Sequence, residues 1–227
     1  MHLYIAGDSM MGLPGMALVN LANKTRVVKS LLDYRISSGL CRPDFFDWPA
    51  QLRSQAGSFK PGAVALMFGA NDRQGVQTAS GKVYNFRTDG WEREYRRRVR
   101  DVIGLLFDAG VRRIYWIGQP VMPDATFDGQ MRVMNEIYRT EAAKHPGVRY
   151  IDAHALLSDK DGKFAQYLRD GDGVMQQVRE ADGEHMTYAG GLRIAEAVMT
   201  AIEKDWSEKK GKAAGKASPK ASATPAP

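Results

Sequence analysis

Short apolar runs of strand length recur along the chain, and segments with helical spacing of apolar residues lie between them. Several of these runs are apolar at every position rather than at alternate positions. This is typical of strands that are buried on both faces of a parallel sheet. The predicted strands cover residues 2–6, 27–32, 63–68, 113–117 and 148–151.

Helical periodicity is clearest over residues 91–109, which end at Gly110. One stripe of this segment carries Tyr95, Val99, Val102, Ile103, Leu106 and Phe107. The other predicted helices cover residues 14–25, 48–57, 127–145 and 188–206. Because strands and helices alternate, we expect an α/β fold: a three-layer α/β/α sandwich around a central, mostly parallel five-stranded sheet.

Three segments depart from this alternation. Residues 72–90 predict a polar, glycine-bearing loop, and residues 158–181 predict turns that could flank a hairpin. Residues 207–227 are rich in Lys, Ala, Ser and Pro and hold too few apolar residues to fold. We therefore expect one domain over residues 1–206 and a disordered tail over residues 207–227.

The formal net charge of +6 is concentrated in this tail. Five lysines and one glutamate within residues 207–227 carry +4, which leaves only +2 for the rest of the chain. The run Arg96–Arg98 has acidic neighbours and is interpreted as a solvated helix face rather than a phosphate-binding patch. The charge pattern therefore argues against a nucleic-acid partner.

The compartment is left open by the sequence. A single cysteine, Cys41, excludes an intramolecular disulfide, and no run approaches the ~18 apolar residues that a membrane span needs. We see no signal peptide, because the first apolar run leads directly into Gly7 and Asp8. An export or anchor segment upstream of Met1 is an alternative that mass spectrometry of the native N-terminus would decide.

Polar residues that suit acyl-transfer chemistry follow three of the predicted strands. Ser9 follows the first strand, at a turn into a helix where backbone N–H groups could stabilise an oxyanion. Gly39 follows the second strand, and Asn71 follows the third with an amide that can donate to the same oxyanion. Ligands bind at the carboxyl ends of strands in open α/β sheets, so we expect these groups to meet.

Asp182 and His185 precede the last predicted helix. A serine hydroxyl needs a base to act as a nucleophile at neutral pH, and a histidine base needs a carboxylate to orient it. The three-residue offset lets Asp182 reach one ring nitrogen of His185 while the other faces Ser9. Structural alternatives are a helix cap for Ser9, a structural histidine at position 185 and a loop bridge for Asn71.

Four motifs in this order resemble those of the SGNH (GDSL-like) hydrolase superfamily: Gly7-Asp8-Ser9, the isolated Gly39, Gly69-Ala70-Asn71-Asp72 and Asp182-Gly183-Glu184-His185. The resemblance implies an SGNH/flavodoxin-like fold. The resemblance spans residues 7–187 and is closest to a poorly characterised bacterial branch that is usually predicted to be exported. It implies that Ser9 is the nucleophile, that His185 is the base and that Asp182 orients it. It also implies an oxyanion hole formed by Ser9, Gly39 and Asn71.

Other motifs give weaker indications. Arg73 could contact an anionic or sugar substrate, or could simply lie on the surface. Cys41 has no paired base and is interpreted as a buried thiol. Leu13 stands where a phosphate-binding loop needs lysine, and the Asp159–Gly162 segment is a turn rather than a calcium loop. We therefore expect no cofactor and no metal.

The expected function is hydrolysis of a small acyl ester, such as an O-acetyl group on a carbohydrate, through an acyl-enzyme on Ser9. The alternatives are an acyltransferase that modifies a cell-envelope glycan and a non-catalytic glycan-binding protein on the same fold. The basic tail is expected to be a linker or a tether to anionic envelope polymers or membrane. Substrate, oligomeric state and localisation, whether exported or cytoplasmic, are not determined by the sequence.

Overall fold

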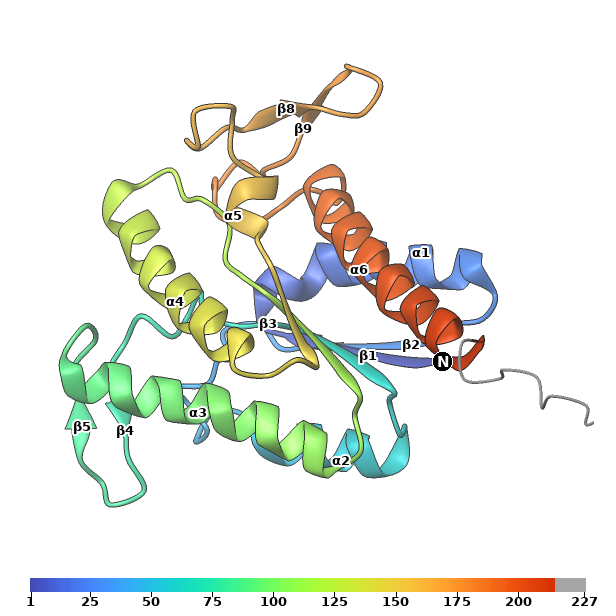
Figure 1. The fold of residues 1–227 in the computed structure, drawn as a ribbon. Coiled ribbons are helices and arrows are strands. Elements are labelled where there is room, and N and C mark those ends of the chain that lie inside the picture. The colour runs from blue at the N-terminus through green and yellow to red at the C-terminus, as the bar shows by residue number, and fades with distance from the viewer. Residues whose placement is uncertain (215–227) are drawn as a thin grey trace, which may run out of the picture.

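The computed structural model describes residues 1–214, with side chains described to residue 207. Its centre is a five-stranded sheet in the order β2-β1-β3-β6-β7, in which every pairing is parallel (Figure 1). The strands are β1 (His2–Gly7), β2 (Lys29–Tyr34), β3 (Ala63–Met67), β6 (Arg113–Ile117) and β7 (Val148–Ile151). The predicted fold class is confirmed.

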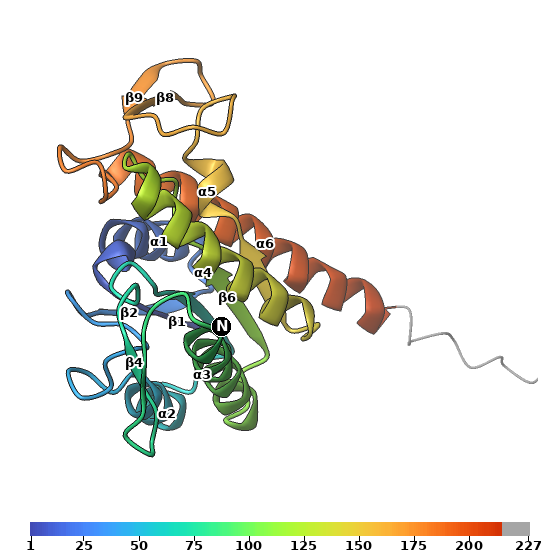
Figure 2. The ribbon, with the colours of Figure 1, turned by 90° about the vertical axis from the view of Figure 1, so that its left-hand side faces the viewer.

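Helices cover both faces of this sheet (Figures 1 and 2). Helices α1 (Gly12–Thr25) and α6 (Tyr188–Ala214) pack against each other on one face. Helices α2 (Trp48–Ser58), α3 (Asp89–Asp108) and α4 (Ala125–Ala143) follow one another across the opposite face. A short 3-10 helix, η1 (Ser9–Met11), precedes α1, and a short helix, α5 (Ala153–Leu156), follows β7. No helix within residues 1–214 is long and apolar enough to span a membrane.

The core lies between the sheet and its two helical layers. Strand β3 is buried at every position, and β1 is buried at every position except His2, because helices cover both faces. On the α2–α3–α4 face, aromatic rings contact one another from the sheet to the helices: Trp48, Phe68, Trp116, Tyr138, Tyr95 and Trp91. Edge-to-face and stacked ring pairs of this kind add to the free energy gained by burying apolar area.

One of the irregular segments contains more structure than the sequence predicts, and another contains the hairpin that it predicts. The 72–90 segment, predicted as a loop, contains a small antiparallel hairpin of β4 (Val76–Gln77) and β5 (Val83–Tyr84). The 158–181 segment contains the hairpin suggested by its turns, formed by β8 (Tyr167–Arg169) and β9 (Met175–Gln177). In Figure 1 this second hairpin lies at the top of the view, above α5 and the start of α6.

The C-terminal boundary also differs from the expectation. Helix α6 continues past residue 206 to Ala214, so the first part of the predicted tail extends the last helix. The remainder of the predicted tail, from residue 215, lies outside the described residues. The predicted role of the tail as a linker or tether therefore stays a prediction.

Helices α1 and α6 approach each other at backbone distance where Gly191 faces the first turn of α1. A Cβ atom built on Gly191 would lie 2.7 Å from the backbone nitrogen of Pro14 and 2.8 Å from the carbonyl carbon of Leu13. Neither of these atoms belongs to a flexible side chain, so an added methyl group would have to push the helices apart. Ser9 precedes α1 and His185 precedes α6, so this contact bears directly on the site described below.

We predict that Gly191→Ala destabilises the protein by about 1–3 kcal/mol, because it overpacks the contact between the two helices. The matched control is Gly104→Ala in α3, where a Cβ atom would meet nothing within 4 Å. That control should stabilise the protein by up to about 1 kcal/mol, since alanine is the better helix former. Chemical denaturation of both variants tests this, and an unchanged midpoint for Gly191→Ala would contradict it.

Candidate active site

The turn after β1 places Ser9 at the carboxyl edge of the sheet, and the carboxylate of Asp8 holds it there. Asp8 is fully buried and accepts hydrogen bonds from the backbone N–H groups of Met10 at 2.9 Å, Gly69 at 2.9 Å and Ala70 at 3.2 Å. Burial raises the pKa of Asp8 to about 7, although the three N–H donors act in the opposite direction. Asp8 therefore ties the turn after β1 to the turn after β3.

Ser9, His185 and Asp182 form one chain of hydrogen bonds. The Nε2 atom of His185 lies 3.1 Å from the Oγ atom of Ser9, and its Nδ1 atom lies 2.8 Å from Oδ2 of Asp182. The other carboxylate oxygen of Asp182 accepts the backbone N–H groups of Glu184 and His185. Burial opposes ionisation of Asp182, but the hydrogen bonds from His185 hold the pKa of this carboxyl group below its usual value.

The turn that carries His185 is fixed by its own sequence and by a buried arginine. Gly183 has φ = +72°, a left-handed conformation that favours glycine, and a Cβ there would lie 2.9 Å from Pro123. The guanidinium of Arg179, fully buried, donates to the carbonyl oxygens of Glu184 at 2.9 Å and of Val121. Sequence reasoning missed Arg179, because its partners are backbone carbonyls, which leave no motif, and Val121 is 58 positions away.

Gly39 lies against a second buried carboxylate, that of Asp72. Asp72 accepts the N–H groups of Leu40 at 2.9 Å and Cys41 at 2.7 Å, so it fixes the segment after β2. A Cβ atom on Gly39 would lie 2.2 Å from the Oδ1 atom of Asp72, so the segment can adopt this position only with glycine. Burial raises the pKa of Asp72. Sequence reasoning assigned no role to Asp72, although it stands directly beside Asn71.

The three donors predicted for an oxyanion hole follow β1, β2 and β3, at the carboxyl edge of the sheet. Within residues 1–214, neither the N–H group of Ser9 nor that of Gly39 has an intramolecular acceptor. The side-chain amide of Asn71 donates to the carbonyl oxygen of Ser38 at 3.0 Å, which is the loop bridge considered as an alternative role. An amide nitrogen carries two hydrogens, so this bridge orients Asn71 and leaves one hydrogen for a ligand.

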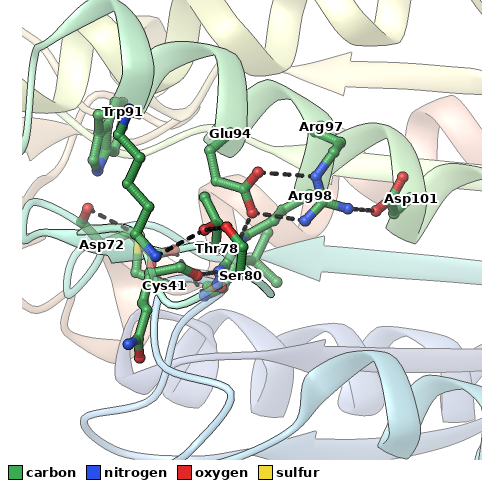
Figure 3. A network of polar contacts seen from close by, with 12 residues as sticks. Cys41, Asp72, Thr78, Ser80, Trp91, Glu94, Arg97, Arg98 and Asp101 are labelled. Carbon is green, nitrogen blue, oxygen red and sulfur yellow. Dashed lines mark hydrogen bonds and ion pairs between the residues drawn. The ribbon is translucent and has the colours of Figure 1, made fainter. Parts of the chain in front are cut away.

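Helix α3 holds the segment that carries Gly39 through the side chain of Arg98. Arg98 donates to the carbonyl oxygen of Leu40, to that of Gln77 in β4 and to the carboxylate of Glu94 at 3.1 Å. Figure 3 shows Cys41 and Asp72 beside the charged side chains of α3. The side chain of Arg98 is only 12% exposed. The prediction that the Arg96–Arg98 run is a solvated face is therefore wrong for Arg98, which is held by backbone carbonyls far away in sequence.

Asp72 is also held from the α3–α4 side. The hydroxyl of Tyr95 donates to Asp72 at 2.7 Å and lies 2.7 Å from the hydroxyl of Tyr138, which donates to the carbonyl oxygen of Phe68 at 2.9 Å. Every polar atom of this buried group therefore has a partner. A satisfied buried network of this kind fixes side chains in one arrangement.

The other residues that the sequence analysis discussed are Cys41, Arg73 and Asp159. Cys41 is buried, as predicted, and burial raises the pKa of its thiol, so it is unsuited to act as a nucleophile. Arg73 is exposed, and its guanidinium lies 4.1 Å from the ring centroid of Phe127, so its predicted contact with substrate stays a prediction. Asp159 accepts the N–H groups of Asp161 and Lys163, which makes this segment a turn, as predicted. No group of three or more His, Cys, Asp or Glu side chains in the described part of the chain is placed to hold a metal ion.

Solved structures of esterases and related enzymes share this fold. The psychrotrophic esterase EstA from Pseudoalteromonas sp. aligns with a TM-score of 0.60 at 10% identity, over 91% of this chain and 98% of that one. A family 3 carbohydrate esterase from Clostridium thermocellum aligns with a TM-score of 0.56 at 14% identity, over 88% and 94%. The salicylyl-acyltransferase SsfX3 from a tetracycline biosynthetic pathway aligns with a TM-score of 0.52 at 15% identity, over 89% and 55%.

Similarity at these identities establishes the fold, and the expected SGNH-type architecture is confirmed. No functionally curated protein matches the sequence significantly. One family model covers nearly all of the described domain: the model for DUF459, a protein family of unknown function, matches residues 2–201. The chain therefore belongs to the DUF459 family.

Proposed function

We propose that this protein is a serine ester hydrolase in which Ser9 is the nucleophile. The observation that carries the proposal is the hydrogen-bond chain from Ser9 Oγ through His185 to Asp182, with distances of 3.1 Å and 2.8 Å. Ser9 follows β1 and Gly39 follows the neighbouring strand β2, and their N–H groups have no acceptor within the described residues. A hydroxyl, a base, an orienting carboxylate and free donors are together the requirements of acyl transfer through a serine.

The first half of the proposed reaction forms an acyl-enzyme. Ser9 Oγ attacks the ester carbonyl carbon while its proton passes to His185 Nε2. The carbonyl oxygen becomes an oxyanion, which the N–H groups of Ser9 and Gly39 and the amide of Asn71 stabilise. When the tetrahedral intermediate collapses, the bond to the alcohol oxygen breaks, and His185 returns its proton to that oxygen.

The second half repeats these steps with water. His185 takes a proton from a water molecule, whose oxygen attacks the acyl carbon, and the proton is then returned to Ser9 Oγ as the acid leaves. Asp182 keeps the imidazole in the tautomer whose Nε2 can accept a proton, and it stabilises the imidazolium formed in both halves. The low pKa of Asp182 keeps its carboxylate charged for this role.

Exposure of the site favours water as the acceptor over a second alcohol. The side chains of His185 and Asp182 are 41% and 50% exposed, so water reaches the base directly. A transferase has to keep water away from its acyl-enzyme. The acyltransferase SsfX3 shares the fold, so transfer to an envelope glycan is the second candidate. Product analysis with an acyl donor in the presence and absence of a glycan acceptor separates the two.

The acyl group that we expect first is small, and an O-acetyl group on a carbohydrate is one candidate substrate. The support for a carbohydrate is a fold shared with a family 3 carbohydrate esterase. Acetylated oligosaccharides and simple acetate esters should be compared as substrates. A glycan-binding protein without catalysis is the alternative if neither is turned over.

We predict that Ser9→Ala lowers the kcat for p-nitrophenyl acetate by at least about a thousandfold, because no other group can form the acyl-enzyme. The matched control is Ser54→Ala, an exposed serine of α2 that should leave the rate unchanged. Steady-state release of coloured p-nitrophenolate, followed by its absorbance, gives both rates. Equal rates for wild type and Ser9→Ala would show that Ser9 is not the nucleophile.

We predict that Asp182→Asn lowers kcat by roughly a hundred- to ten-thousandfold, with the fold retained. An asparagine can keep the Oδ1 contacts to the N–H groups of Glu184 and His185, but its amide replaces the oxygen that accepts from His185 Nδ1. The matched control is Glu184→Gln, which removes a neighbouring charge and should change kcat less than about threefold. Circular dichroism checks folding, and similar rates for both variants would show that Asp182 does not orient the base.

A further inference from the structure

An apolar pocket of about 330 Å³ opens beside Ser9 and His185, on the α1 side of the sheet. Its walls come from the start of α1, the end of β2 with the turn after it, and the residue that follows His185. The apolar wall residues include Met10, Leu13, Pro14, Met16, Tyr34, Ile36 and Met186. The chemistry proposed above uses only the two polar residues at the mouth of this pocket and leaves the apolar walls unexplained.

Two of the wall residues are large apolar side chains left in contact with solvent. Met16 is 42% exposed and Ile36 is 68% exposed, whereas Met186 behind them is 2% exposed. Single exposed apolar residues are common, but several around one concave site mark a surface that binds an apolar group. Glu180 is the one acidic side chain that lines the pocket within the described residues.

We propose that this pocket binds an alkyl chain of the ester substrate. The inference rests on the proposed function, because it concerns the ester attached at Ser9. In the tetrahedral intermediate, the carbonyl carbon is bonded to Ser9 Oγ and its oxygen faces the donors at Gly39 and Asn71. The two remaining substituents are the acyl chain and the alcohol. A pocket that opens at both Ser9 and His185 receives one of these two.

The size of the pocket indicates a chain longer than acetyl. On the order of ten molecules of liquid water occupy the pocket's volume of about 330 Å³. The methyl group of an acetyl ester leaves most of that space to water, whereas a chain of several methylenes replaces the water with apolar contacts. The proposed substrate class is therefore an alkyl ester with an apolar chain on one side of the scissile bond, in place of the carbohydrate acetate considered above, which has no such chain.

The test uses two substrate series that distinguish the acyl side from the alcohol side. The first is p-nitrophenyl acetate, butyrate and hexanoate, and the second is ethyl, butyl and hexyl acetate followed by pH titration of the released acid. Burial of a methylene predicts a rise in kcat/KM of roughly fourfold for each added methylene, in the series whose variable chain enters the pocket. The series that rises identifies which side of the ester the pocket holds.

The variants Ile36→Ser and Met16→Ser test whether the rise of kcat/KM with chain length depends on this pocket. Both positions are exposed, so the substitutions remove apolar wall area without opening a cavity in the core. Each substitution should reduce the rise of kcat/KM to about twofold or less for each added methylene. The matched control is Val27→Ser, a residue that is 72% exposed at the opposite end of β2 and should retain the full dependence.

The outcomes separate this inference from the proposed function. If Ser9-dependent turnover of acetate esters is present but kcat/KM is flat or falls with chain length in both series, the pocket proposal is overturned and the hydrolase proposal stands. A rise that survives in both Ile36→Ser and Met16→Ser also overturns it, because the chain then lies elsewhere. Absence of Ser9-dependent turnover for every ester would instead overturn the proposed function.

Discussion

The close packing of α6 on α1 is the constraint on which the rest of the site depends. Ser9 and His185 are 176 positions apart in the sequence, yet their side chains meet at 3.1 Å. Each lies a few residues before one of these two helices, so the distance between the helix starts sets the distance between the hydroxyl and the imidazole. The helices can approach this closely because Gly191 presents no side chain to the backbone of Leu13 and Pro14.

Two buried carboxylates then fix the three loops at the edge of the sheet relative to one another. Asp8 follows β1 and holds the turn after β3, whereas Asp72 follows β3 and holds the segment after β2. Burying a carboxylate is costly unless hydrogen bonds compensate it, so each loop is stabilised in the position where its N–H groups reach these oxygens. The segments that carry the N–H groups of Ser9 and Gly39 are thereby fixed before any ligand binds, and the proposed oxyanion stabilisation needs preorganisation of this kind.

Most of the fold could be predicted from local sequence patterns, because buried parallel strands are apolar at nearly every position. The predicted strand of residues 113–117 matches β6, and the predicted helices differ from the observed ones mainly at their ends. The pairing of Asp182 with His185 was also accessible, since a three-residue offset places both on one turn. The long-range contact with Ser9 was inferred from the base that a serine nucleophile needs and from a family resemblance, rather than from any local pattern.

What sequence reasoning missed depends on contacts between distant segments. Arg98 looks solvated in a run of three arginines, but carbonyl oxygens of Leu40 and Gln77 bind it. Asp72 gains its role only when the Gly39 segment folds over it, and the β4–β5 hairpin is too short to show alternation. The apolar pocket joins Met16, Ile36 and Met186 from three separate segments, so no single stretch of sequence could indicate it.

The central claim is that the hydroxyl of Ser9 is a nucleophile activated by His185. Its most direct measurement is the reaction of the intact protein with a fluorophosphonate, followed by mass spectrometry of the whole chain and of its peptides. We expect one adduct per chain, located on Ser9, with labelling that is strongly slowed by His185→Ala. A protein that stays unlabelled, or that carries the adduct on another residue, would show that Ser9 is not the activated nucleophile.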